Sequence, residues 1–189
     1  STAQQAEALC LDQEGGQVAR LQPPFTVFPG NPFLTNEAEV DRFADITAKE
    51  LLQIGINMNM VPVLDIAAGV ENSIMAERAF PGGPEAVARL GCRMIVQFQK
   101  KKVMAVAKHF PGIGRTTTDS HIDQPELDAD LSLIESADLV PFQAAIDHDV
   151  AGIMLSHICY TGIDPALPAS LSVPVVKDLL RDAMGYDGV

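Results

Sequence analysis

Short apolar runs alternate with helical segments along this chain of 189 residues, and this alternation constrains the fold more than any other feature. The apolar runs predict strands at residues 8–11, 58–64, 103–107 and 152–155, with a fifth strand starting at 186–189. The segments between them predict helices at residues 36–54, 84–102, 139–148 and 174–184. A βαβα order implies a parallel sheet with helices packed outside it. We therefore predict an α/β fold with a single domain over residues 1–189.

Capping and breaking residues mark the borders of these helices. Asn36, followed three residues later by Glu39, predicts a capped start for the first helix, and Gly55 predicts its end. Pro84 suits a first helical position, and the apolar residues after it recur at spacings of three and four, as on one buried face. Asp138 is a candidate cap for the third helix.

Polar residues stand directly after the predicted strands. The residues in these positions are Asp12, Asp65, Lys108 with His109, and His157. Active sites of parallel α/β barrels lie at the carboxyl ends of the strands, and open parallel sheets bind ligands there as well. A complete eight-stranded barrel takes at least about 200 residues, so the chain is either an open-sheet domain or part of a barrel.

The composition excludes several classes of protein. Hydrophobic residues make up 47% of the chain and charged residues 20%, which excludes a disordered polyelectrolyte. No apolar run reaches the roughly 18 residues that a membrane-spanning helix needs. The net charge of −12 argues against a nucleic-acid partner, which would need a basic face. Three widely spaced cysteines disfavour a disulfide framework and favour the cytoplasm.

The segment from residue 108 to residue 127 carries the strongest chemical signal. Lys108 and His109 leave an apolar run and enter a loop rich in Gly, Pro and Thr, in which Asp119 and His121 follow. An aspartate two residues before a histidine can accept the Nδ1–H of the imidazole, which leaves Nε2 free to give or take a proton. The alternative interpretation is that Asp119 caps a turn and that His121 is merely exposed.

Weaker signals lie in three other loops. After Asp12, two glycines permit a tight turn, from which Arg20 can point back over the end of the sheet, although such a pattern is more often a turn than a site. Arg78 is a candidate hydrogen-bonding clamp, or a solvated loop residue. His157 and Asp164 are either ligand contacts or residues that hold a loop together.

Metal-dependent hydrolysis is the main chemical alternative. The chain has four histidines but neither His-x-His nor His-Glu-x-x-His. Side chains that could converge on a metal only through tertiary structure are His109, Asp119, His121 and His157. We therefore expect no metal site and no cofactor. Ser-His-Asp catalysis is also disfavoured, because the chain lacks a Gly-x-Ser-x-Gly motif.

Seven segments, in this order and at these spacings, carry a resemblance to a known family. They are DQEGGQVARL, GINMNMVPVLDI, ERAF, KHFPGIG, DSH, SHICYTGIDPALPASLS and GYDGV. Over essentially its whole length, the chain resembles the glycoside hydrolase family 3 β-N-acetylglucosaminidases. The resemblance implies a TIM-type barrel, incomplete in this chain, and a retaining reaction through a glycosyl-enzyme intermediate.

The resemblance also implies roles for individual residues. The residues that match those holding the terminal N-acetylglucosamine are Asp12, Arg78, Lys108 and His109, and Arg20 matches the arginine after the Gly-Gly turn. One rim, at the carboxyl ends of parallel strands, is expected to be lined by Asp12, Arg78, Lys108, His109, Asp119 and His121. The family usually has Gly-His-Gly or a similar triplet where Ile113 stands here, a difference that we expect to alter loop packing more than catalysis.

Two further residues match the catalytic machinery of the family. Asp119 and His121 match an unusual general acid/base dyad, in which histidine replaces the carboxylic acid of most retaining glycosidases. The segment GYDGV leads, in the family, into a strand that carries the aspartate nucleophile, so we expect that nucleophile just beyond Val189. The family's first strand and helix are expected before Ser1. The chain is thus expected to be an internal part of a catalytic barrel and inactive by itself.

The implied function is hydrolysis of terminal non-reducing β-N-acetylglucosamine residues, with peptidoglycan-derived muropeptides as substrates. The alternatives are another β-glycosidase or a glycoside phosphorylase of the same family, or a sugar-binding module without catalysis. A net charge of −12 is unfavourable for such acidic substrates. We expect the pocket to be locally basic instead, through Arg20, Arg78, Lys108 and Arg115.

Overall fold

A computed structural model of the chain describes residues 7–117, 126–128 and 131–189. Four parallel strands form one sheet in the order β1-β4-β5-β7. Their bounds are Cys10–Leu11 for β1, Met58–Asn59 for β4, Met104–Phe110 for β5 and Gly152–Leu155 for β7. The order in the sheet is the order in the chain, so each strand lies beside its successor, as in the wall of an α/β barrel.

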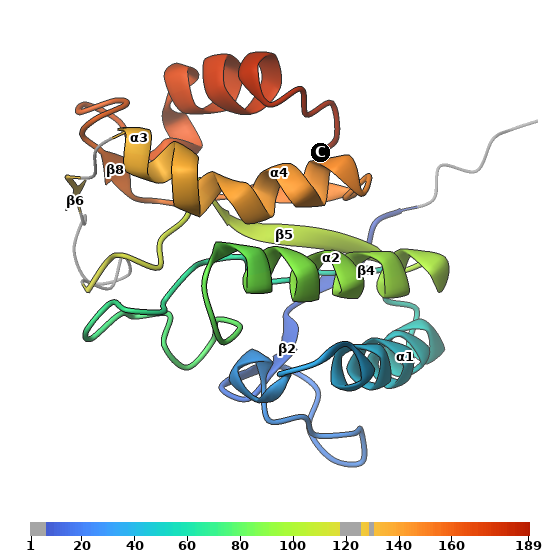
Figure 1. The fold of residues 1–189 in the computed structure, drawn as a ribbon. Coiled ribbons are helices and arrows are strands. Elements are labelled where there is room, and N and C mark those ends of the chain that lie inside the picture. The colour runs from blue at the N-terminus through green and yellow to red at the C-terminus, as the bar shows by residue number, and fades with distance from the viewer. Residues whose placement is uncertain (1–6, 118–125, 129–130) are drawn as a thin grey trace, which may run out of the picture.

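The helices lie outside this sheet, as the sequence predicts. Their bounds are Glu37–Gln53 for α1, Pro84–Lys100 for α2, Leu139–Asp147 for α4 and Pro174–Ala183 for η4, a helix with π-type hydrogen bonds. Figure 1 shows α1, α2 and α4 side by side, and α2 and α4 both contact β5. The face of α2 that the sequence marks as apolar is buried, through Val87, Leu90, Met94, Ile95 and Phe98.

The predicted start of the first helix is confirmed. The side chain of Asn36 accepts a hydrogen bond of 3.1 Å from the backbone N–H of Glu39. The Glu39 carboxylate accepts one of 2.7 Å from the N–H of Thr35, so two backbone donors at the helix start are satisfied. Beyond the last turn, Gly55 has a φ of +84°, a left-handed conformation that glycine adopts without strain.

The predicted cap at Asp138 is wrong. The residues before it are already helical, in α3 (Leu131–Leu133) and η2 (Ile134–Asp138), and the helix continues into α4. No capping hydrogen bond is made by Asp138. Its buried carboxylate instead accepts a hydrogen bond of 2.7 Å from Nε of Arg115, in the loop after β5. Burial raises the pKa of Asp138, against the opposing effect of Arg115.

The second predicted strand is shorter than its apolar run. Strand β4 ends at Asn59, although the sequence predicts a strand over residues 58–64. Pro62 has no N–H to donate to a ladder. The chain nevertheless stays beside β5, because Lys108 donates its backbone N–H to the carbonyl of Pro62 (3.0 Å) and accepts from the N–H of Leu64 (2.7 Å). This contact keeps the end of the run, and hence Asp65, close to Lys108.

At the far edge of the sheet, the last residues of the chain lie along β7. Val189 accepts a backbone hydrogen bond of 2.9 Å from Ile153 and donates one of 3.3 Å to Ala151. Residues 186–189 do not form a regular strand, although the sequence predicts that one starts there. The two backbone hydrogen bonds of Val189 join this segment to the sheet.

The remaining elements are short and lie in the loops. Strands β2 (Gln13–Gly15) and β3 (Val18–Ala19) form an antiparallel hairpin, and β6 (Glu126–Leu127) pairs in parallel with β8 (Cys159–Tyr160). Two 3₁₀ turns complete the list, η1 (Asn31–Phe33) and η3 (Ala169–Leu171). Among the helices of the described residues, none is both long and apolar enough to cross a bilayer.

Candidate functional site

A pocket of about 490 Å³ opens at the carboxyl ends of the parallel strands. Its walls come from the loops after β1, β5 and β7 and from the segment around residues 74–78. The polar or charged side chains that line it are Asp12, Gln17, Arg20, Arg78, Lys108, His109, Ser156 and His157. The apolar ones are Val18, Ile74, Met75, Ile113, Met154, Leu155 and Ile158. Such a mixture of apolar walls and converging polar groups is typical of a small-molecule site.

Lys108 forms the charged floor of this pocket. Its side chain is only 2% exposed and extends from β5 between two carboxylates. The ammonium Nζ lies 2.7 Å from Oδ1 of Asp12 and 2.6 Å from Oε1 of Glu14. Asp12 is one-third exposed and faces the pocket, whereas Glu14 is 2% exposed and lies behind it. A buried ammonium ion needs such partners to offset the loss of its hydration.

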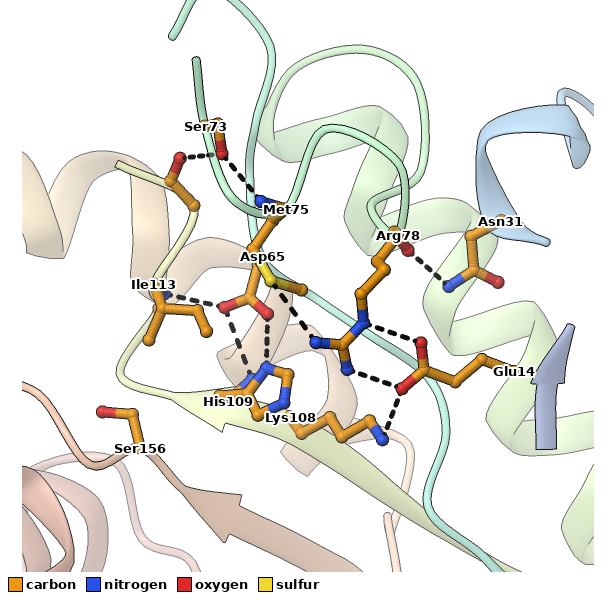
Figure 2. Close-up of polar contacts among 12 residues, drawn as sticks. Glu14, Asn31, Asp65, Ser73, Met75, Arg78, Lys108, His109, Ile113 and Ser156 are labelled. Carbon is orange, nitrogen blue, oxygen red and sulfur yellow. Dashed lines mark hydrogen bonds and ion pairs between the residues drawn. The ribbon is translucent and has the colours of Figure 1, made fainter. Parts of the chain in front are cut away.

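Arg78 lies beside Lys108 and shares the same carboxylate. Figure 2 shows its guanidinium facing Glu14, with Nε 3.0 Å from one oxygen and Nη2 2.7 Å from the other. The backbone carbonyl of Arg78 accepts a hydrogen bond of 3.0 Å from the side chain of Asn31. Burial lowers the pKa of Arg78, but the hydrogen bond and the charge of Glu14 outweigh this effect and leave that pKa raised.

His109 is oriented by a fully buried carboxylate. Its Nδ1 lies 2.7 Å from Oδ2 of Asp65. The other oxygen of Asp65 accepts hydrogen bonds from the backbone N–H groups of Ile113 (2.7 Å) and His109 (3.4 Å), as Figure 2 shows. Since a carboxylate can only accept, this contact places a proton on Nδ1 and leaves Nε2 available to a ligand.

Side chains after β7 form the opposite wall. The hydroxyl of Tyr160 donates to the carbonyl of Gly112 (2.8 Å) and lies 3.1 Å from the Ser156 hydroxyl, which joins this wall to the loop after β5. Burial raises the pKa of Tyr160 far above its ordinary value. His157 lines the pocket, and its Nδ1 lies 3.1 Å from the Ser170 hydroxyl, so it both faces the pocket and holds a loop.

Asp164 holds a loop together, which is one of its two predicted roles, and does not line the pocket. Its Oδ1 accepts hydrogen bonds from the backbone N–H groups of Ala166 (3.0 Å) and Leu167 (3.2 Å), in a turn outside the pocket. A hydrogen bond to Ser172 is the main cause that lowers the pKa of Asp164, and the bonds from Ala166 and Leu167 lower it further.

The structure brings together most of the predicted site residues. The five that line this one pocket are Asp12, Arg20, Arg78, Lys108 and His109. The geometric prediction of a common rim is therefore confirmed for four of its six residues, Asp12, Arg78, Lys108 and His109. The roles of the five pocket residues in binding stay predictions. Asp119 and His121 lie outside the described residues.

Sequence reasoning missed Glu14 and the position of Asp65 in the site. The signal for Glu14 was available, because the three predicted site cations, Arg20, Arg78 and Lys108, outnumber the two predicted carboxylates, and a buried cation needs a partner of opposite charge. Asp65 stands at the end of an apolar run, yet its pairing with His109 depends on how two strands align, which no local pattern reveals.

The predicted excess of positive charge in the pocket is smaller than a count of its basic residues suggests. Arg78 and Lys108 are paired with carboxylates, and Arg115 contacts Asp138 rather than the pocket. Arg20 is exposed at the pocket, where the described residues place no carboxylate in ion-pair contact with it. Within the described ranges, no group of three or more His, Cys, Asp or Glu side chains is arranged to hold a metal ion.

Comparison with known proteins identifies the family. The model of the glycosyl hydrolase family 3 N-terminal domain matches residues 4–189. This chain belongs to glycosyl hydrolase family 3. The family domain is a TIM-barrel-like α/β fold, and the described strands form an open part of such a barrel, which confirms the predicted fold class.

Relatives in family 3 include named β-hexosaminidases. The chain is 35% identical over 189 residues to the beta-hexosaminidase of Alkalilimnicola ehrlichii, an alignment that covers 95% of this chain and 54% of the relative. It is 33% identical to beta-hexosaminidase A of Pseudoalteromonas piscicida, over 100% of this chain and 36% of that protein. The chain thus spans about half the length, or less, of these relatives.

Solved structures of family 3 enzymes superpose closely on this chain. A β-N-acetylglucosaminidase from Paenibacillus sp. str. FPU-7 has a TM-score of 0.92 at 40% identity, covering 96% of this chain and 35% of that one. NagZ from Neisseria gonorrhoeae, solved in complex with N-trifluoroacetyl-D-glucosamine, has a TM-score of 0.90 at 33% identity, covering 96% and 56%.

Proposed function

We propose that the protein is an exo-acting β-N-acetylglucosaminidase whose pocket binds the terminal non-reducing sugar. The observation that carries this proposal is the set of converging groups on the pocket floor, at the carboxyl ends of parallel strands in a family 3 chain. A family 3 relative has been solved with an N-acylated glucosamine, which supports a sugar of this kind. Peptidoglycan-derived muropeptides are the proposed natural substrates.

The floor matches the chemistry of a sugar. Each hydroxyl of a sugar can donate one hydrogen bond and accept others. Asp12 supplies an acceptor, Lys108 and Arg78 supply donors, and His109, whose Nδ1 contacts Asp65, lines the same pocket. The apolar side chains of Ile74 and Met75 give the sugar a face without polar groups.

The proposed reaction retains the anomeric configuration. His121 acts as general acid and then as general base, and Asp119 holds its ring and stabilises its charged form. An aspartate that the family resemblance places after Val189 attacks the anomeric carbon from the opposite face. A glycosyl-enzyme intermediate forms, and water activated by His121 hydrolyses it.

Hydrolysis of 4-nitrophenyl N-acetyl-β-D-glucosaminide by the product of the complete gene tests this proposal. Lys108→Met should lower kcat/KM by about a hundredfold or more, because it removes a buried charged donor and leaves two carboxylates unpaired. Lys102→Met is the matched control, since Lys102 is exposed between α2 and β5 and does not line this pocket. Thermal unfolding of both variants checks that they are folded.

Other outcomes identify the alternatives. Turnover of the β-glucoside but not of the N-acetylglucosaminide would indicate another β-glycosidase. Turnover that requires inorganic phosphate would indicate a phosphorylase, and sugar binding without turnover would indicate a binding module. Release of N-acetylglucosamine from a muropeptide tests the natural substrate.

A further inference from the structure

One buried carboxylate, that of Glu14, contacts both cations of the pocket. Its Oε1 lies 2.7 Å from Nη2 of Arg78 and 2.6 Å from Nζ of Lys108, and its Oε2 lies 3.0 Å from Nε of Arg78. Figure 2 shows Glu14 between the two cationic side chains, on the side away from His109. Glu14 itself is 2% exposed and does not line the pocket. It therefore acts on a ligand only through Arg78 and Lys108.

The backbone around Glu14 is held firmly. Gln13 exchanges two hydrogen bonds with the side chain of Asn59 (3.0 and 3.2 Å), and its own side chain exchanges two with Leu21 (2.9 and 3.3 Å). Gly15 has a φ of +86°, and a Cβ on it would lie 3.0 Å from backbone atoms of Phe28 and Gly30. The carboxylate is thus preorganised where the two cations meet.

The charges on the floor cancel, while donors remain. Lys108 and Arg78 face two carboxylates, Glu14 and Asp12, so these four groups of the floor carry no net charge. The exposed Arg20 lines the same pocket outside this set. The ammonium of Lys108 has three N–H bonds for two carboxylate contacts. Among the described residues, Nη1 of Arg78 has a single hydrogen-bond partner, the sulfur of Met75 at 3.8 Å. The floor therefore offers hydrogen-bond donors without a cation that lacks its counter-charge.

We propose that Glu14 is a specificity-determining residue that makes the pocket select an uncharged terminal sugar. This inference rests on the proposed function. A sugar with a carboxylate at the floor would lose hydration and find both cations already paired with carboxylates, so its charge would be poorly compensated. Specificity would then come from rejection of the anionic competitor as much as from attraction of the neutral sugar.

Two ligands of similar shape isolate the effect of charge. The first is N-acetylglucosaminuronic acid, which carries a carboxylate on C6, and the second is the corresponding neutral uronamide. We expect calorimetry at pH 7 on the product of the complete gene to show the acid binding about tenfold or more weakly than the amide. Equal affinities in the unmodified protein would overturn the proposal without any variant being needed.

Glu14→Gln tests the residue itself. The substitution keeps the size of the side chain and removes its charge, so the ratio of the two dissociation constants, acid over amide, should fall by on the order of tenfold. Glu77→Gln is the matched control. Glu77 precedes Arg78 in the chain, but its side chain is exposed and does not line the pocket, so the substitution removes the same charge outside the pocket. Glu14→Asp, which keeps the charge, should keep a ratio well above one.

The two proposals fail in distinguishable ways. If the unmodified protein binds the amide and N-acetylglucosamine but Glu14→Gln leaves the ratio unchanged, Glu14 does not set specificity, and the proposed function stands. If the unmodified protein binds neither neutral sugar, the proposed function fails. If Glu14→Gln does not fold, Arg78→Gln is informative, because removal of a cation should raise the ratio, and a lower ratio would contradict the charge argument.

Discussion

Burial has opposite consequences for single side chains, depending on whether a partner of opposite charge is buried with them. Lys108 is nearly inaccessible and lies between two carboxylates, which stabilise its charge. Cys92 is buried on α2, where burial raises the pKa of its thiol to about 11 and the negative charge of Asp147 adds to this effect. The loss of water disfavours an ion in both places, but two carboxylates offset it for the ammonium of Lys108, whereas no such partner offsets it for the Cys92 thiolate.

The three thiols should differ in reactivity. Cys10 is exposed and should be alkylated first by iodoacetamide in the folded protein, whereas Cys92 and Cys159 are buried and should react slowly. The reaction of Cys92 should accelerate up to about pH 11, because the thiolate is the nucleophile. Peptide mapping by mass spectrometry between pH 7 and pH 10 measures this, and equal rates for Cys10 and Cys92 at pH 8 would contradict it.

The same pKa shift has a consequence for stability. The folded-state pKa of Cys92 lies above the ordinary value of 9.0, so the neutral thiol is the form that the fold favours. Its contribution to the free energy of unfolding is complete below about pH 9 and is lost as the pH rises toward 11. In Cys92→Ala, this contribution to the decrease in the free energy of unfolding between pH 8 and pH 10.5 should be absent. Denaturant unfolding of both proteins at the two pH values measures the difference.

Among the elements, the loop after β5 is held by backbone contacts that leave no room for a side chain. A Cβ on Gly114 would lie 2.1 Å from the carbonyl oxygen of Ile66, and the Gly114 carbonyl accepts a hydrogen bond of 2.6 Å from the Ser73 hydroxyl. Ile74 donates its N–H to the carbonyl of Thr116 (3.2 Å). The segments around Ile66, Ser73 and Gly114 thus meet at one point of the rim, where no residue larger than glycine fits at position 114.

Gly114→Ala should destabilise the protein because backbone atoms cannot give way as a flexible side chain can. We expect the free energy of unfolding to fall by roughly 1–3 kcal/mol, the range for overpacking of a dense site. Gly83→Ala is the control, since the nearest atom to its Cβ is a Glu85 oxygen at 4.0 Å, and it should cost less than about 1 kcal/mol. Urea denaturation compares the two, and equal losses would refute the packing argument.

Elements were predictable where their signals are local. The border at Asn36 follows from residues within one turn, so the sequence predicts it correctly. The end of β4 depends on Pro62 and on the alignment with β5, and Asp138 contacts an arginine 23 positions earlier rather than a helix N–H. Such long-range choices are set by the assembled fold, and a pattern within one segment does not reveal them.

At the scale of the whole molecule, the net charge of −12 says little about the pocket. The sequence gives the number of charges, and an expectation of a basic pocket follows when arginines and lysines are counted without their partners. Folding pairs Lys108 with two carboxylates that stand 96 and 94 positions earlier, Asp12 and Glu14. The βαβα order predicts that the strand ends lie at one edge of the sheet. It does not predict this pairing, which depends on the conformation of the loops in the folded protein.

The proposed acid/base role of His121 can be tested on the product of the complete gene. If His121 protonates the glycosidic oxygen, His121→Ala should be most harmful for aryl glycosides with poor leaving groups, which need that proton. Positioned acids and bases typically contribute about 10²–10⁴-fold to rate, and each tenfold loss corresponds to about 1.4 kcal/mol of barrier. Asp119→Ala should show the same trend more weakly, because the imidazole remains.

The decisive quantity is the slope of log kcat/KM against the pKa of the leaving phenol. His121→Ala should steepen it, since an activated phenol departs without protonation and a basic one does not. His148→Ala is the control, because His148 is exposed at the end of α4, where it hydrogen-bonds the carbonyl of Ala144 (2.8 Å). The slope measured for His148→Ala should equal the slope of the unmodified protein. A uniform loss across the series for His121→Ala would assign His121 to binding or loop structure, and the proton donor would have to be another group.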